Sequence, residues 1–544
     1  MKRLLGALAL IAALSSHGQK TLSKEYEYKV STPYKNVDAN DNYYLTGDGK
    51  AISVKIDKRD VFVQKYDIDK PGMVSEKFYE DAYPKNAVVE RVLFINGKVI
   101  LFYTQWDGDN KKEQLYVQEI DMDKGEFKGP AKLLLKIDGK VSGVGSGRVM
   151  DFNLTDKFIV YRSFDNKNFL VQYRRIPEKK RDTKSFDQIG LVAFDGDMNQ
   201  LSSREITMPY TERRMDVLDY QLDNKGNLFM LTKVFHDDSN DDKKRKKDEE
   251  ANYHIELFTL KPGSDKLNVT KVENKDKFIN RLNIFDSPKG DIVAAGFFSN
   301  GKGKNFQRNC DGVITFKMKS DGTVYDQFTY DIPVEVINEY ESKKTKRKNE
   351  RKEENGEGAK FTDLVLRDVE VMDDGSVILV GEQYFYQVHH HVGMNGSSGS
   401  TTVTYHYYDI LATKINADGS LAWMKKVPKI QNGSSGKGGM SYQYFHNDKD
   451  HFLVFLDNVK NYNLAADQVP VKHTDGSGGY LTAVRIEDKT GNFTKASILN
   501  SRDVEDINLE RMKMDAILKT SDNTFILESY KKRREDVLLR VVLK

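Results

Sequence analysis

Short runs of alternating apolar and polar residues recur along the whole chain, separated by tight polar turns. Leu228–Leu231 and Val313–Phe316 are examples, and β-branched and aromatic residues are frequent in all of them. Such runs are typical of β-strands, and no stretch has the apolar spacing of an amphipathic helix. The pattern therefore predicts an all-β protein.

A single unit repeats: a strand, a tight turn, an apolar strand, a loop, a third strand, a second tight turn and a fourth strand. The turns are rich in Asn, Asp and Gly, which accept the left-handed backbone that short hairpins require. The first turn is expected at residues 39–41, 96–97, 155–156, 224–226, 288–290, 373–375, 448–450 and 521–523. The second turn is expected at residues 69–72, 123–125, 195–197, 262–264, 320–322, 417–419 and 488–491.

Four-stranded antiparallel units that repeat around a ring describe a β-propeller. The copies of the first turn favour eight blades, and seven is the alternative because the first copy is the weakest. Two packed β-sandwich domains are disfavoured, since no linker divides the chain and the unit recurs throughout. We expect residues 19–544 to form one propeller domain.

The last copy of the unit, residues 512–544, contains only three strand-like runs. Tyr26–Val30 is a strand-like run near the other end with no partner of its own. Pairing it with Val537–Leu543 would complete the last blade and remove two exposed strand edges. The sequence therefore predicts a propeller closed by its N-terminal strand.

Residues 1–18 have the order of features found in a signal peptide. Lys2 and Arg3 precede the apolar run Leu4–Leu14, which is too short to span a bilayer, and small residues precede a cut before Gln19. No later apolar run is long enough to cross a membrane. We expect an exported protein, periplasmic or extracellular, without a membrane span.

The charge is nearly balanced. The 85 basic and 82 acidic side chains leave a net charge of +3, which argues against nucleic acid as a partner. The single cysteine, Cys310, rules out an intramolecular disulfide, so the core alone must hold the fold. Two charged insertions, at residues 236–252 and 341–360, have almost no apolar residues, and we expect both to be disordered.

The most unusual segment is the long hairpin 382–413, which is dense in tyrosine and histidine. A tip near Ser397 would place Gln387 opposite His406. Alternation would then put His389, His391 and His406 on one face, where three imidazoles could bind zinc or copper. Tyr384, Tyr386, Tyr405 and Tyr407 are candidates for contact with a partner. The remaining interpretation is a plain hairpin that covers neighbouring blades.

The sequence contains no nucleophile elbow, zinc-protease, P-loop or dinucleotide-binding motif. No catalytic or cofactor-binding residue is therefore indicated. We expect a monomeric, non-enzymatic scaffold that binds a protein or glycan in the cell envelope. The alternative is a polysaccharide-active hydrolase or lyase with acidic residues at the propeller channel, for which a pair of carboxylates roughly 5–10 Å apart would be the signature.

The run 408–423, YDILATKINADGSLAW, contains a strand, an Asp-Gly turn and a strand that carries Trp423. With KKVPK at 425–429, it resembles the repeat of secreted bacterial propeller-like proteins to which no activity is assigned. The resemblance implies export and a propeller, and it carries no functional residues. The signatures of WD40 and kelch propellers are absent.

Overall fold

The computed structural model describes residues 22–142, 156–177, 184–243, 250–264, 266–273, 277–303, 305–391, 400–434, 438–465 and 467–544. The expected signal peptide, the cut before Gln19 and most of the hairpin tip lie outside these residues.

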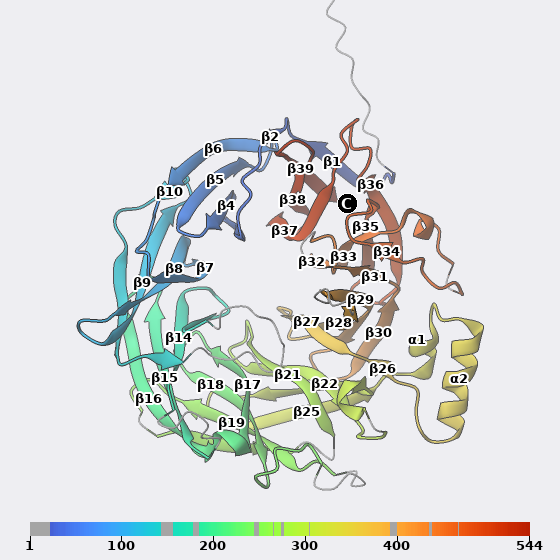
Figure 1. Cartoon of the computed structure of the whole chain (residues 1–544). Helices are drawn as coiled ribbons and strands as arrows, with labels where there is room; N and C mark the ends of the chain where they lie inside the picture. The colour runs from blue at the N-terminus through green and yellow to red at the C-terminus, as the bar shows by residue number, and fades with distance from the viewer. Residues whose placement is uncertain are drawn as a thin grey trace, which may run out of the picture.

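The described chain forms eight sheets that each contain at least four strands, and Figure 1 shows them arranged in a ring. The first strand of each blade lies nearest the centre, and the first strands of most successive blades contact one another. The predicted all-β propeller with eight blades is confirmed.

Blade one contains β3 (Asp41–Gly47), β4 (Lys50–Asp57), β5 (Asp60–Asp67) and β6 (Gly72–Tyr79), and blade two contains β7 (Ala87–Ile95), β8 (Lys98–Asp107), β9 (Lys112–Asp121) and β10 (Glu126–Phe127). Blade three contains β13 (Ile159–Arg162), β14 (Asn168–Arg175), β15 (Phe186–Asp195) and β16 (Gln200–Thr211), and blade four contains β17 (Met215–Leu222), β18 (Leu228–Phe235), β19 (Tyr253–Leu260) and β20 (Asn268–Val272). Two further strands extend these sheets. β11 (Lys132–Asp138) pairs with β9 of blade two, and β12 (Val141–Ser142) pairs with β14 of blade three.

Blade five contains β21 (Phe278–Asp286), β22 (Ile292–Ser299), β24 (Gly312–Met318) and β25 (Val324–Asp331), and blade six contains β27 (Leu364–Val371), β28 (Val377–His391), β29 (Ser400–Ile415) and β30 (Leu421–Val427). Blade seven contains β32 (Gln443–His446), β33 (Asp450–Asp457), β35 (Tyr480–Glu487) and β36 (Phe493–Asn500), and blade eight contains β37 (Arg511–Ser521), β38 (Thr524–Tyr530), β39 (Glu535–Leu543) and β1 (Tyr26–Val30). The remaining elements are β2 (Tyr34–Lys35), β23 (Asn309–Cys310), β26 (Phe361–Thr362), β31 (Gln431–Gly433), β34 (His473–Thr474), α1 (Val334–Asn338), α2 (Lys343–Glu354) and 3₁₀ turns at Glu212–Arg214, Phe306–Arg308 and Val459–Asn461.

The turns between strands follow the sequence pattern with two corrections. The turn expected at 39–41 precedes β3, and the first hairpin of blade one instead turns at Asp48 and Gly49, both with positive φ. The run after residues 155–156 forms the inner strand β13, and the turn to β14 uses Asn166, also with positive φ. In both copies the inner strand fits the pattern that the sequence predicts for the second strand, because its apolar run is short.

The core lies between neighbouring blades. Each of eight clusters of buried apolar residues joins one blade to the next, including blade eight to blade one. Phe445 and Phe525, for example, stack at 5.1 Å between blades seven and eight. The middle strands are buried on both faces, which explains their continuous apolar runs.

The N-terminal strand lies in the last blade. β1 pairs antiparallel with β39, with Tyr26 opposite Leu543 and Val30 opposite Leu539. Both Tyr26 and Tyr28 are 1% exposed and belong to the core shared by blades seven and eight. The pairing of Tyr26–Val30 with Val537–Leu543 is the one that the sequence predicted.

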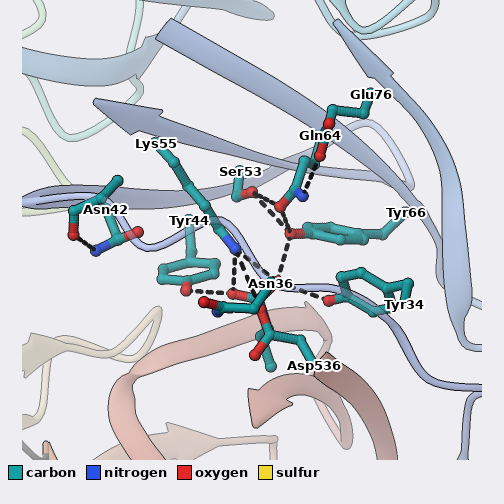
Figure 2. Close-up of polar contacts among 12 residues, drawn as sticks. Tyr34, Asn36, Asn42, Tyr44, Ser53, Lys55, Gln64, Tyr66, Glu76 and Asp536 are labelled. Atoms are coloured by element: carbon teal, nitrogen blue, oxygen red, sulfur yellow. Dashed lines mark hydrogen bonds and ion pairs between the residues drawn. The ribbon is translucent and has the colours of Figure 1, made fainter. Parts of the chain in front are cut away.

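A buried charge cluster joins blade one to blade eight (Figure 2). The Lys55 ammonium on β4 lies 2.7 Å from the Glu528 carboxylate on β38 and 3.7 Å from that of Asp536 on β39. Lys55 is 1% exposed. Burial alone would raise the pKa of Glu528, but Lys55 and its hydrogen-bond donors hold it below its usual value. Burial and Glu528 together raise the pKa of Asp536 to about 6.

Three tyrosine hydroxyls complete the coordination of the Glu528 carboxylate. They donate from Tyr34, Tyr44 and Tyr66 at 2.6, 2.6 and 2.9 Å. Tyr34 belongs to β2, Tyr44 to β3 and Tyr66 to β5. A single carboxylate on blade eight thus gathers groups from blade one and from the segment after the N-terminal strand.

The two charged insertions are more ordered than expected. In the first, residues 244–249 lie outside the described residues, but Asn252 is buried and donates to Asp237 at 2.9 Å. The second contains α2, so the expectation of disorder for residues 341–360 is wrong. α2 forms without an apolar face because polar contacts hold it, beginning with an N-cap in which the Thr345 amide donates to Ser342 at 3.2 Å.

Candidate functional site

The hairpin of blade six extends well beyond its sheet. β28 and β29 contain 15 and 16 residues, whereas β27 and β30 contain 8 and 7. The extension is supported on one side by β31, which pairs with Tyr405–Tyr407 of β29. Gln431 of β31 donates to the Leu456 carbonyl of blade seven at 2.7 Å, so the base of the extension lies beside blade seven.

The register of the hairpin differs from the expected one. His406 lies opposite Phe385 rather than Gln387. A register irregularity between Glu382 and Tyr384 moves the pairing, and a shift of two residues leaves each side chain on its expected face. Tyr384 is opposite Tyr407, and Tyr386 is opposite Tyr405, so the four candidate tyrosines share one face.

Three of these tyrosines line a cavity of about 460 Å³. Its wall is built from blades six, seven and eight and comprises Tyr384, Tyr405, Tyr407, Gly438, Met440, Ser441, Tyr442, Gln443, Met514 and Asp515. The rings of Tyr384 and Tyr407 are 4.9 Å apart. Tyr386 is 42% exposed and does not belong to this lining.

A buried ion pair supports the tyrosine wall from behind. The Glu382 carboxylate lies 2.8 Å from the Lys429 ammonium, and both side chains are fully buried. Burial lowers the pKa of Lys429, and Glu382 opposes that change. Lys429 also donates to the Tyr407 carbonyl at 3.1 Å, which fixes the backbone beneath the ring.

The same carboxylate holds Ser441 of the cavity lining and Arg367, which lies near two of the lining rings. Glu382 accepts hydrogen bonds from Arg367 Nε at 3.1 Å and from Ser441 Oγ at 2.7 Å. The Arg367 guanidinium lies 5.2 Å from the Tyr384 ring centre and 5.7 Å from that of Tyr407. Ser441 has a φ of +69°, a backbone conformation that serine rarely adopts.

Two acidic side chains, Asp368 and Asp515, also lie at or near the cavity wall. Tyr442 donates to Asp368 Oδ2 at 2.8 Å, and burial raises the pKa of Asp368. Burial by the surrounding wall also raises the pKa of Asp515. Asp515 lines a second cavity of about 290 Å³ as well, together with Asp41 and Lys513.

The histidines lie on the hairpin beyond the cavity. His389 pairs with Thr402 on the same face as His406, and the His391 backbone pairs with that of Ser400. Four residues separate His389 from Phe385, so about 14 Å of strand lies between His389 and His406. His406 is buried, stacks on Phe385 at 4.5 Å and bonds to the Tyr408 hydroxyl at 3.2 Å. Burial lowers its pKa.

The register thus leaves His406 apart from His389. Within the described ranges, no group of three His, Cys, Asp or Glu side chains could hold a metal ion. The His391 side chain lies outside the described atoms. The zinc or copper site stays a prediction.

Thermal melting tests that prediction directly. A site on this face would make zinc or copper raise the melting temperature, because a ligand that binds only the folded state stabilises it. We expect His389→Ala to abolish the shift. The control is His390→Ala, which removes an exposed imidazole from the opposite face and should leave the shift unchanged. No shift with either metal in the unmodified protein would end the hypothesis.

Sequence reasoning identified the tyrosines but missed Arg367, Glu382, Lys429 and Asp515. The available signal was weak: Glu382 directly follows the apolar run Val377–Gly381, where a charge is out of place. Nothing local could show that its partner is Lys429, which lies beyond the whole hairpin.

The chain matches no protein-family model and no curated protein. Solved structures of similar fold include a prolyl endopeptidase, at 10% identity and a TM-score of 0.37 over 93% of this chain. The polysaccharide lyase Uly1 has 8% identity and a TM-score of 0.37 over 94%. The propeller domain of the Trilobed protease from Pyrococcus furiosus has 10% identity and a TM-score of 0.32 over 84%.

This chain spans 55% of the prolyl endopeptidase, 92% of Uly1 and 96% of the Trilobed protease domain. These neighbours are similar in fold, and their activities differ. Among the described residues, no helix is long and apolar enough to cross a membrane.

Proposed function

We propose that this chain is an exported binding module that takes a glycan in the tyrosine-lined cavity of blade six. The observation that carries the proposal is the cavity itself. Its volume of about 460 Å³ lies within the usual range for ligand pockets, roughly 300–1,000 Å³. Its wall combines aromatic faces with a few polar groups.

That combination suits a sugar ring. The C–H face of a pyranose packs against aromatic rings such as Tyr384 and Tyr407, which bury large apolar area and keep a polar hydroxyl. Sugar hydroxyls need both donors and acceptors at the edge, and Ser441, Gln443 and Asp515 provide both. Glu382 and Lys429 hold the wall in place before a ligand arrives, which reduces the cost of binding.

Paired tyrosine substitutions test the proposal. We expect Tyr384→Ala with Tyr407→Ala to weaken binding of a responsive oligosaccharide by about tenfold or more, equivalent to about 1.4 kcal/mol. The measurement is calorimetry against a panel of neutral and acidic oligosaccharides. Tyr386→Ala is the matched control, because it removes the same side chain from the same face outside the cavity.

Two results would contradict the proposal: no oligosaccharide in the panel binds, or Tyr386→Ala weakens binding as much as the cavity variant. Melting curves of both variants show whether the fold survives. Binding of an envelope protein that depends on Tyr386 would instead favour a protein partner on the outer hairpin.

A polysaccharide-active hydrolase or lyase is the second candidate. The observation that favours it is the neighbouring cavity, where Asp41 and Asp515 both contribute carboxylates beside Lys513. A hydrolase of this kind uses two carboxylates, one as an acid. Release of shorter oligosaccharides from the panel by the unmodified protein, lost in Asp515→Asn, would identify this activity.

A further inference from the structure

The helical segment between blades five and six lies outside the ring (Figure 1). α1 and α2 follow β25 and precede β26, and they contact each other. Lys426 of β30 anchors the segment by donating to the Ile337 carbonyl at 3.2 Å and to Glu341 at 2.9 Å. The position of this segment separates it from the tyrosine-lined cavity.

α2 is held along one side only. Asn349 is buried and donates to Asn338 of the segment that precedes the helix at 2.8 Å. Beyond the C-terminus of the helix, Lys302 donates to the Gly356 carbonyl at 3.0 Å, and Glu353 accepts from the Ala359 amide. These contacts fix the helix and leave its opposite side to solvent.

That outer side carries a continuous row of cations. Its exposed basic residues are Lys343, Lys344, Arg347, Lys348 and Arg351. At 3.6 residues per turn they occupy roughly 140° of the helix surface and about 12 Å of its length. None of the five side chains has an ion pair or hydrogen bond to another residue in the described part of the chain. Glu350 lies at one edge of the row, and Glu354 lies within its angular range just past Arg351 at the C-terminal end.

This arrangement is unfavourable for the helix itself. Lys343 and Lys344 lie in the first turn, which has no acidic residue, although the helix dipole favours anions there. Within the row itself, three like-charged pairs lie four residues apart, and such pairs repel. They are Lys343 with Arg347, Lys344 with Lys348, and Arg347 with Arg351. Helix stability therefore does not account for the row, and a bound polyanion would relieve both effects.

The chemistry of the row favours one kind of polyanion. A helix that lies on a membrane needs an apolar face to insert, and this face has none. Binding to single-stranded nucleic acid uses aromatic side chains for stacking, and α2 has no aromatic residue. We propose that the outer face of α2 binds an anionic polysaccharide with carboxylate or sulfate groups. This site is independent of the tyrosine-lined cavity.

The test compares two variants with equal change in net charge. The first is Lys344→Gln, Lys348→Gln and Arg351→Gln, which removes three cations from the row and keeps good helix formers. The second is Lys85→Gln, Lys124→Gln and Lys261→Gln, which removes three exposed lysines spread over three blades. The probes are a heparin oligosaccharide and an alginate oligosaccharide, titrated at several salt concentrations.

We expect the α2 variant to bind both probes at least tenfold more weakly at low salt. The slope of log affinity against log salt should fall by about 2, because three fewer cations release counterions. The dispersed variant should bind like the unmodified protein, and so should the Tyr384→Ala, Tyr407→Ala variant. The last result separates this site from the cavity.

Three outcomes overturn the proposal. One is an α2 variant that binds both probes like the unmodified protein, and another is an equal loss in the dispersed variant, which would show a general charge effect. The third is α2-dependent affinity for phosphatidylglycerol vesicles or a short DNA duplex that equals or exceeds the affinity for the polysaccharides. Circular dichroism of the α2 variant confirms that the fold is retained.

Discussion

Lys55→Met should destabilise the protein by about 3–5 kcal/mol, since removal of one partner leaves the other charges buried and uncompensated. Methionine keeps the unbranched stem that packs between blades one and eight and removes only the ammonium group. The loss is large against a typical stability of about 5–15 kcal/mol. Thermal and denaturant unfolding of the variant and the unmodified protein measure it.

The loss of stability caused by Lys55→Met should also depend on pH. In the unmodified protein, Lys55 holds the pKa of Glu528 below its usual value. Without Lys55, burial would raise the pKa of Glu528 above its unfolded value, so the folded variant would bind a proton more tightly than the unfolded chain does. Its stability then falls as pH rises through that range. We therefore expect a larger difference from the unmodified protein at pH 8 than at pH 5.

The matched control is Lys128→Met. Lys128 pairs with Glu119 at 2.9 Å, but its side chain is 60% exposed, and such pairs contribute about 0–1 kcal/mol. Equal losses in the two variants would show that the Lys55 cluster does not stabilise the interface between blades one and eight. A loss of stability that shrinks as pH rises would contradict the expected upward shift of the Glu528 pKa in the Lys55→Met variant.

The repeating part of this fold could be predicted because each of its strands and turns is encoded within a short stretch of sequence. Turns built on Asn, Asp and Gly recur at the hairpins, and counting strands in the last unit indicated that Tyr26–Val30 belongs beside β39. The mistakes in copies one and three arose where local pattern is ambiguous. A short apolar run such as that of β13 fits either of two neighbouring strand positions.

The charged interior could not be predicted in the same way. Lys55 and Glu528 each interrupt an apolar strand, which signals a buried charge, but 473 residues separate them. Their partnership depends on how the ring brings blade eight against blade one. The same holds for Glu382 and Lys429 behind the cavity.

α2 shows a different limit of prediction from the sequence. Its composition, with no apolar residue, is typical of a disordered segment. Order comes from particular contacts, such as Asn349 with Asn338 and Lys426 with Glu341. Composition records how much apolar surface a segment can bury and contains no information about such polar anchors.

Deletion of residues 22–32 should destabilise the protein as strongly as loss of Lys55 does. β1 pairs with β39 over five residues, and each hydrogen bond contributes about 0.5–1.5 kcal/mol net. The deletion also removes Tyr26 and Tyr28 from the core shared by blades seven and eight. β39 would then be an unpaired edge, which is prone to aggregation. We expect a much lower melting temperature and aggregation on heating.

Two further variants separate strand pairing from burial. Tyr26→Ser with Tyr28→Ser keeps the strand and removes its buried side chains, and it should lower the melting temperature strongly. Glu27→Ser with Lys29→Ser changes the exposed face of the same strand and should have little effect.

A synthetic peptide of residues 22–32 provides the most direct test of closure by the N-terminal strand. If the truncated propeller keeps an open site beside β39, the peptide should raise its melting temperature in a concentration-dependent way, because binding to the folded state stabilises it. A peptide with both tyrosines replaced by serine should have no effect. A truncated protein that melts like the full chain would show that the ring is held closed by the contacts of blades eight and one alone.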